Sequence, residues 1–196
     1  RGIEQPDCNL AIWQRDPEPR VAHYLESADL RRMPGLALTV APALAPDQIR
    51  EAFEERGLPD GADRDLWIDD MAAHVELFAR LADIPVVRMK LDVLSHDECH
   101  LFHVDGVHLR LLCTYLGPGT EWLGNRQVAR DQLGKGSNEH VIRYGEPERI
   151  PTWAVAVLKG ERYPGNEGAG VVHRSPLIEA DGLARVRLRL DVPGWR

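Results

Sequence analysis

The chain of 196 residues is 43% hydrophobic and 28% charged, which suits a soluble protein with one buried core. Its 24 basic and 31 acidic residues give a net charge of −7, and this balance argues against general nucleic-acid binding. No apolar run approaches the ~20 residues of a membrane span, and three cysteines are too few for a disulfide framework, so we expect a cytoplasmic protein.

Helical patterns dominate residues 1–84. Residues 17–33 carry prolines and acidic residues early and arginines late, which suits the dipole of a helix. Residues 45–61 open with Ala-Pro-Asp and end in a Leu-Pro-Asp-Gly turn. Residues 63–85 end at a proline and place apolar side chains at helical spacing, namely Trp67, Met71, Val75, Phe78 and Leu81. We therefore predict three helices in this region.

Strand patterns replace the helical ones after residue 85. Segments rich in Val and Leu alternate as half-buried strands do, and they cover residues 86–94, 107–116, 152–160 and 184–192. Clusters of Gly, Pro and Asn separate these segments, as they do in a sandwich or an open barrel. We predict an α+β protein in which the β-core of residues 85–196 carries the helical region 1–84 on its outside, in one integrated domain.

The sequence Phe-His-Val-Asp places His103 and Asp105 two positions apart. Alternate residues of a strand point the same way, so both side chains can reach one metal ion. Two histidines and one carboxylate are the ligands of many mononuclear iron sites. His173, at the end of a short Val-Val strand, is the candidate third ligand. Three further histidines compete for these positions: His96, His100 and His108.

A row of arginines follows the last candidate ligand. Arg185, Arg187 and Arg189 alternate along one predicted strand. An oxygenase that uses 2-oxoglutarate needs a cation for the far carboxylate of this cosubstrate, and the planar fork of arginine matches a carboxylate in two bonds. The alternative is that all three arginines face solvent while the apolar residues between them pack inside, since an inward row would be costly to bury.

The order His103-x-Asp105, then His173, then an arginine resembles the iron- and 2-oxoglutarate-dependent dioxygenases of the double-stranded β-helix fold, also called jelly-roll or cupin-like. The stretches LRLLCTYLGPGTEWL, VAVLKGERYPGN and VVHRSP resemble more specifically the bacterial domain of unknown function 1826 family. The resemblance implies that His103, Asp105 and His173 bind Fe(II), and that dioxygen and 2-oxoglutarate are cosubstrates. Residues expected at the cosubstrate are Arg185 or, in its place, Arg187 or Arg174, with Tyr115 beside it.

Other side chains near these motifs are candidates for substrate binding. Trp122 and Asn125 follow a tight turn, and Lys159 begins a loop just before the His173 segment. Cys99 precedes His103 by four positions and could line the same pocket, although a small buried apolar role is the simpler interpretation. For the loop residues, plain exposure to solvent is the default interpretation.

Two functions fit these patterns. The first is a non-haem Fe(II)/2-oxoglutarate dioxygenase that hydroxylates a small molecule, an amino acid or a peptide. The alternative is a cupin-like protein that holds zinc or another metal in metal homeostasis, without oxygenase activity, because the same three ligands also suit zinc. We expect no nucleic-acid or membrane partner, and the helical region could form a homodimer.

Overall fold

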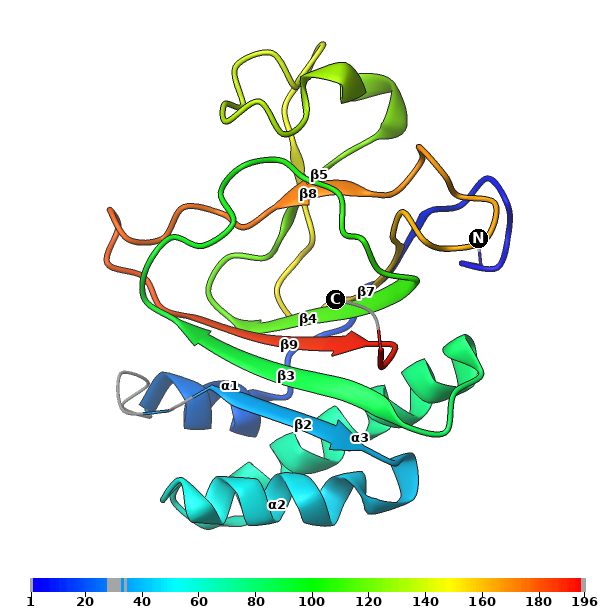
Figure 1. Cartoon of the computed structure of the whole chain (residues 1–196). Helices are drawn as coiled ribbons and strands as arrows, with labels where there is room; N and C mark the ends of the chain where they lie inside the picture. Colours follow the sequence, from blue (N-terminus) through cyan, green and yellow to red (C-terminus); the bar gives the residue numbers. More distant parts are fainter. Residues whose placement is uncertain (1, 28–32, 34, 195–196) are drawn as a thin grey trace.

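A computed structural model describes residues 2–27, 33 and 35–194, and it consists of two antiparallel sheets with helices on one side (Figure 1). The larger sheet has six strands in the order β1 (Leu10–Trp13), β7 (Val155–Lys159), β4 (Leu109–Leu116), β9 (Arg185–Asp191), β3 (Val87–Leu94) and β2 (Leu36–Val40). The smaller sheet has three, in the order β6 (Glu148–Arg149), β5 (Glu121–Leu123) and β8 (Val172–Arg174). The mixture of helices with antiparallel strands confirms the predicted α+β class.

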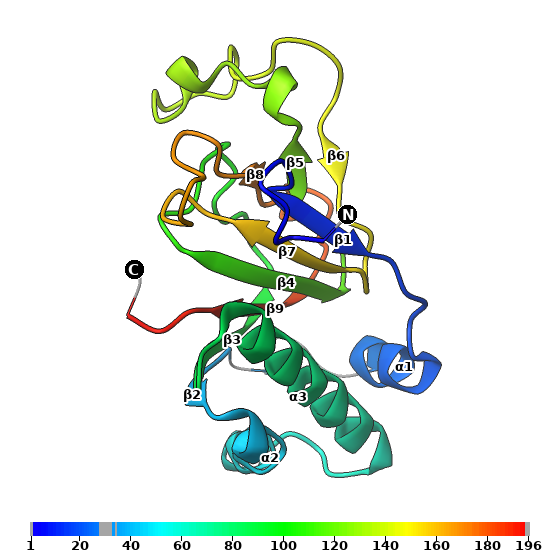
Figure 2. The ribbon, with the colours of Figure 1, turned by 90° about the vertical axis from the view of Figure 1, so that its right-hand side faces the viewer.

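Three α-helices lie against one face of the larger sheet, as the turned view makes clear (Figure 2). They are α1 (Pro19–Ser27), α2 (Ala45–Glu55) and α3 (Ala62–Ala82), and the last two carry the helices predicted from residues 45–85. The first helix was predicted over residues 17–33, and α1 covers part of this range. Residues 28–32 lie outside the described residues. Four residues of the predicted apolar stripe of α3 are fully buried in the core and Leu81 is partly buried, so the helical period identified the core face. Among the described residues, no helix combines the length and apolar character needed to cross a membrane.

The region before residue 85 is more than a helical layer. Two of its segments, β1 and β2, pair with β7 and β3 and form both edges of the larger sheet. The prediction of a mainly helical region missed these strands because each is short: four and five residues. As a consequence, the described part of residues 1–84 and the later β-region share one sheet and one apolar core.

Both faces of strand β9 are covered. Val186, Leu188 and Leu190 are fully buried in the core beneath the helices. Arg185 and Arg187 point from the opposite face into the space between the two sheets, where they are 1% and 9% exposed. The alternative in which these arginines face solvent is therefore wrong. The larger sheet presents an apolar face to the helices and a charged face to the smaller sheet.

Three short 3₁₀ segments complete the described elements: η2 (Pro42–Leu44), η3 (Asn125–Gln127) and η4 (Arg130–Gln132). The last two belong to the long connection between β5 and β6, which lies at the end of the molecule away from the helices (Figure 1). This connection is fastened by a bridge between Val128 and Ile142 and by a small apolar cluster that includes Phe102. It is thus packed against the segment that carries His103.

Candidate metal centre

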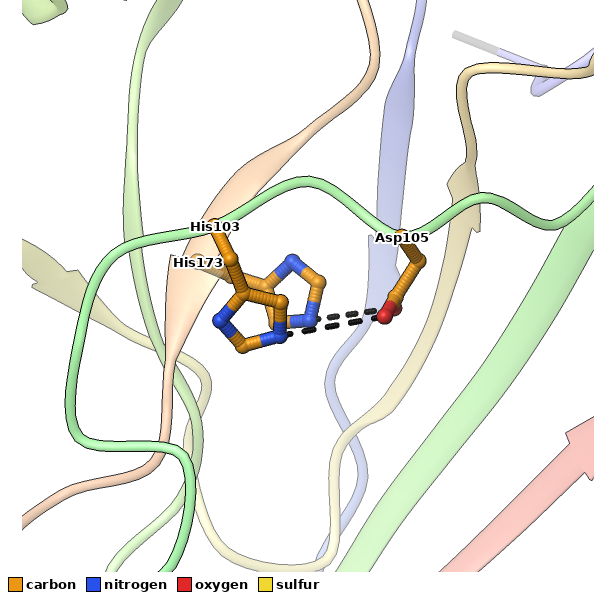
Figure 3. Close-up of side chains that lie close together, drawn as sticks. All are labelled: His103, Asp105 and His173. Carbon is orange, nitrogen blue, oxygen red and sulfur yellow. Dashed lines mark ion pairs between the residues drawn. The ribbon is translucent and has the colours of Figure 1, made fainter. Parts of the chain in front are cut away.

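His103, Asp105 and His173 come together between the two sheets (Figure 3). Nε2 of His173 lies 3.2 Å from Oδ2 of Asp105, and Nε2 of His103 lies 3.7 Å from Oδ1 of the same carboxylate. One ligand atom from each residue lies within 4.8 Å of the others. Two imidazole nitrogens and a carboxylate at this spacing can share one metal ion.

Backbone hydrogen bonds place the three side chains. His103 and His173 form an antiparallel bridge in which each N–H donates to the carbonyl of the other residue at 3.0 Å. The segment after Asp105 is bonded to the chain that leaves β7. The N–H of Glu161 donates to the carbonyl of Asp105, and the N–H of Gly160 donates to the carbonyl of His108. The loop that carries His103 and Asp105 is therefore fixed at both sheets.

Both histidines are oriented for metal binding. Nδ1 of His103 lies 2.8 Å from the carbonyl oxygen of Leu101, and Nδ1 of His173 lies 3.0 Å from that of Val171. A carbonyl oxygen can only accept, so Nδ1 must carry the proton in each ring. Nε2 then keeps its lone pair, and it is the Nε2 atoms that face Asp105. The donor set fits a divalent transition metal.

Asp105 is held as an anion. Burial alone would raise the pKa of its carboxyl group, but the neighbouring His173 and the positive charge of Arg110 hold that pKa well below its usual range. Arg110 donates to Asp105 and, at 2.6 Å, to Asp191 on β9. The pKa of His103 is lowered by burial and by the neighbouring His173, which favours the neutral imidazole. These shifts favour the forms of Asp105 and His103 that bind a cation.

A small inner cavity of about 80 Å³ lies beside the three ligands. Arg187 and Arg189 line it from β9. Cys99 lines it from the loop after β3 and is exposed, so it is not the small buried residue of the simpler interpretation. Arg187 already has a partner, because its Nη2 lies 2.6 Å from a carboxylate oxygen of Asp92 on β3. A cosubstrate carboxylate that binds Arg187 would therefore have to compete with Asp92.

Arg185 lies deeper and has a different environment. Its guanidinium donates to the hydroxyl oxygens of Thr120 at 2.8 Å, Ser175 at 3.2 Å and Thr114 at 3.4 Å. Among the described residues no carboxylate forms an ion pair with it, and its buried Nε has no hydrogen-bond partner. Burial, with the charge of Arg187, lowers its pKa to about 9. A buried cation in this state is a natural receptor for an anion.

Two residues expected at the cosubstrate point elsewhere. Tyr115 faces the helical layer, where its hydroxyl donates to Asp70 of α3 at 2.6 Å, and its strand neighbour Thr114 takes the inward face instead. Arg174 follows the inward-pointing His173 and therefore points outward, where it pairs with Glu121 at 2.7 Å. Strand alternation excludes both from the inner cavity.

The remaining substrate candidates are scattered. Lys159 is buried, donates to the carbonyl of Gln5 at 2.9 Å and therefore contacts the N-terminal segment, not a pocket. Trp122 is the cross-strand partner of His173, is partly buried and packs against the apolar cluster of Leu112, Leu158 and Val171. Asn125 is exposed, and its Oδ1 accepts a hydrogen bond from Arg130 at 2.9 Å.

The competing histidines do not join the cluster. His96 pairs with Glu98 at 3.7 Å, and the ring of His108 lies 4.8 Å from that of Tyr163. Sequence reasoning missed Arg110, which fixes Asp105 to the larger sheet. The alternation of β4 contained the signal, because Arg110 shares a strand face with Thr114, which points into the space between the sheets.

Comparisons with known proteins identify a family. Residues 1–191 match the family described as "Protein of unknown function (DUF1826)", so the chain belongs to this family. None of the curated proteins compared with the chain matches it.

Several solved structures are distantly similar. The dioxygenase for auxin oxidation 1 from Arabidopsis thaliana, in a complex with 2-oxoglutarate, is 11% identical over 89% of this chain and 75% of that one, at a TM-score of 0.47. HygX from Streptomyces hygroscopicus, with iron bound, is 11% identical over 96% of this chain and 85% of that one, at a TM-score of 0.45. Hydroxypropylphosphonic acid epoxidase from S. wedmorenis is 12% identical over 55% and 44%, at 0.33, so the chain spans less than half of that protein. These scores are too low for residue roles to be transferred.

Proposed function

We propose that this member of the DUF1826 family is a non-haem Fe(II)/2-oxoglutarate-dependent dioxygenase with a double-stranded β-helix core. The observation that carries the proposal is the convergence of His103, Asp105 and His173, with both Nε2 atoms turned toward the carboxylate. Three protein ligands leave positions on the metal open for a cosubstrate and dioxygen.

Arg185 supports 2-oxoglutarate as the cosubstrate. Its guanidinium is buried among hydroxyl groups and forms no ion pair with the described carboxylates. The far carboxylate of 2-oxoglutarate would provide the missing anion, with the hydroxyls of Thr120 and Ser175 as further hydrogen-bond donors. The inner cavity beside the metal ligands would hold the rest of the molecule.

Bound at the three ligands, ferrous iron would supply the activation of dioxygen that couples oxidative decarboxylation of 2-oxoglutarate to hydroxylation of a substrate C–H bond. The chain supplies the environment for this chemistry. Arg110 keeps Asp105 ionised, and the carbonyls of Leu101 and Val171 keep both imidazoles in one tautomer. The two sheets and Trp122 limit the access of water to this space.

The experiment is the formation of succinate from 2-oxoglutarate by the purified chain. We expect succinate only when iron and dioxygen are both present, and none from His103→Ala. The control is His140→Ala, which removes an exposed histidine far along the β5–β6 connection and should behave as the wild type. Unchanged succinate formation in His103→Ala would overturn the proposal. Bound zinc without any response to 2-oxoglutarate would support a metal-binding protein without oxygenase activity instead.

A further inference from the structure

His103 separates two cavities. The first is the inner cavity beside Asp105. The second is an outer groove of about 430 Å³, and His103 lines both. This volume is in the range of pockets that take small organic ligands. The groove is lined by His103, Val104, Arg130, Leu133 and, from the loop after β7, Glu161. A ligand in this groove would lie next to a side chain of the candidate metal centre.

Arg130 is fixed within the groove but keeps part of its bonding capacity. Its Nη2 donates to Oδ1 of Asn125 and to the carbonyl of Gly170, each at 2.9 Å. Gly170 directly precedes Val171, whose carbonyl orients His173, so the guanidinium is attached to the same segment as a metal ligand. Among the described residues no carboxylate forms an ion pair with Arg130, and Nε and Nη1 have no hydrogen-bond acceptor there.

The acidic residue in the groove does not occupy Arg130. Oε1 of Glu161 accepts the N–H of Gly168 at 2.6 Å, and Oε2 is buried without a hydrogen-bond partner among the described residues. Glu161 acts on Arg130 only at longer range. The N–H groups of Nε and Nη1, which point in different directions, therefore stay available to a ligand. Val104 and Leu133 offer apolar surface beside them.

We propose that Arg130 anchors the substrate by binding its carboxylate in the outer groove, so that the substrate is a small organic acid with an apolar body. This inference rests on the proposed function, because it assumes that the metal beside His103 performs the reaction. Because Nη2 is already bonded, the carboxylate would accept a charge-assisted hydrogen bond from Nη1, which a neutral acceptor cannot match. Asn125 is a positioning residue, because its Oδ1 is bonded to Arg130 and holds the guanidinium in place.

The test compares 4-phenylbutanoate with its neutral counterpart 4-phenylbutanamide, which has almost the same shape. Binding of each probe to the full chain is measured by ligand-observed NMR, first without metal. We expect the acid to bind the wild type about tenfold more tightly than the amide, since charge-assisted hydrogen bonds are made only by the acid. Arg130→Gln should abolish this preference. The matched control Arg126→Gln, which removes an exposed arginine from η3 that does not line the groove, should retain it.

Equal binding of acid and amide to the wild type would overturn the proposal, and so would a preference that survives in Arg130→Gln. A second measurement tests the position of the groove. With Mn(II) added, the protons of the bound acid should relax faster in the wild type, and no such enhancement would contradict a groove beside the metal. Because charge preference is measured without metal, failure of metal binding and failure of the Arg130 anchor give different results.

Discussion

Arg185 lies on β9 with its guanidinium among three hydroxyl groups, and no described acidic side chain forms an ion pair with it. A purely structural role is a poor explanation, because a buried cation without a counter-charge destabilises a protein. The resemblance to dioxygenases implied that Arg185 binds the cosubstrate. The sequence pattern alone could not decide whether Arg174, Arg185 or Arg187 has this role. The choice depends on the bonding partners, since Arg174 and Arg187 already pair with carboxylates.

Substitution of this arginine tests its role. Arg185→Gln should weaken binding of 2-oxoglutarate about 10- to 100-fold, the loss expected for a charged hydrogen-bonded pair. The free energy of unfolding of the metal-free chain should stay the same or rise. Calorimetric titration of the metal-loaded protein measures the first quantity, and urea unfolding measures the second. Arg88→Gln, which removes an exposed arginine from β3, is the control. Equal affinity for 2-oxoglutarate in Arg185→Gln would exclude the assignment.

At the scale of elements, the position of Asp105 depends on the close approach of two segments. A Cβ atom on Gly160 would lie 2.2 Å from the carbonyl oxygen of Val107 and 2.8 Å from that of Asp105. Gly160→Ala must therefore push the Asp105 loop away from the end of β7. We expect metal affinity to fall about tenfold or more while the chain stays folded, measured by titration with Zn(II).

Gly106→Ala is the matched control for this change. Gly106 lies directly after Asp105, but a Cβ atom there would meet no atom of the described residues within 4 Å. Metal affinity should be almost unchanged in this variant. A similar loss in both variants would mean that any change in the loop disturbs the site, and that the contact at Gly160 is not specific.

The elements themselves were largely predictable from the sequence. The helical period of residues 63–85 and the alternation of residues 184–192 predicted α3 and β9. The alternation left open whether the arginine face of β9 is buried. The edge strands β1 and β2 were missed because four or five residues carry too little periodic signal. The roles of Tyr115 and Lys159 were predicted wrongly because the strand face on which a side chain lies is set by sheet packing, which one strand does not reveal.

For the whole molecule, a buried polar cluster joins the helical layer to the sheet. Asp70 of α3 pairs with Arg15, which follows β1, and accepts the hydroxyl of Tyr115 from β4. Burial alone would raise the pKa of Asp70, but Arg15, His74 and Tyr115 bring it below its ordinary value. A carboxyl group with a depressed pKa stabilises the fold above its unfolded pKa, and this stabilisation is lost as the pH falls through the folded pKa.

Asp70→Asn should therefore lower the free energy of unfolding by about 2 kcal/mol at pH 7, between the values typical of exposed and buried ion pairs. It should also reduce the loss of stability that the wild type shows on acidification below about pH 4. Urea unfolding at a series of pH values measures both effects. Asp69→Asn, an exposed neighbour on the same helix, should change neither. An identical acid dependence in the wild type and Asp70→Asn would show that this cluster does not link the layers.

The most direct test of the proposed function is an anaerobic titration of the purified chain, first with Fe(II) and then with 2-oxoglutarate, followed by visible absorption and iron analysis. We predict one iron per chain and a charge-transfer band that requires both additions. His103→Ala should lose the iron and the band, whereas Arg185→Gln should keep the iron and need more 2-oxoglutarate. Iron that binds equally well to His103→Ala, or iron-loaded wild type that shows no band with 2-oxoglutarate, would contradict the proposed dioxygenase.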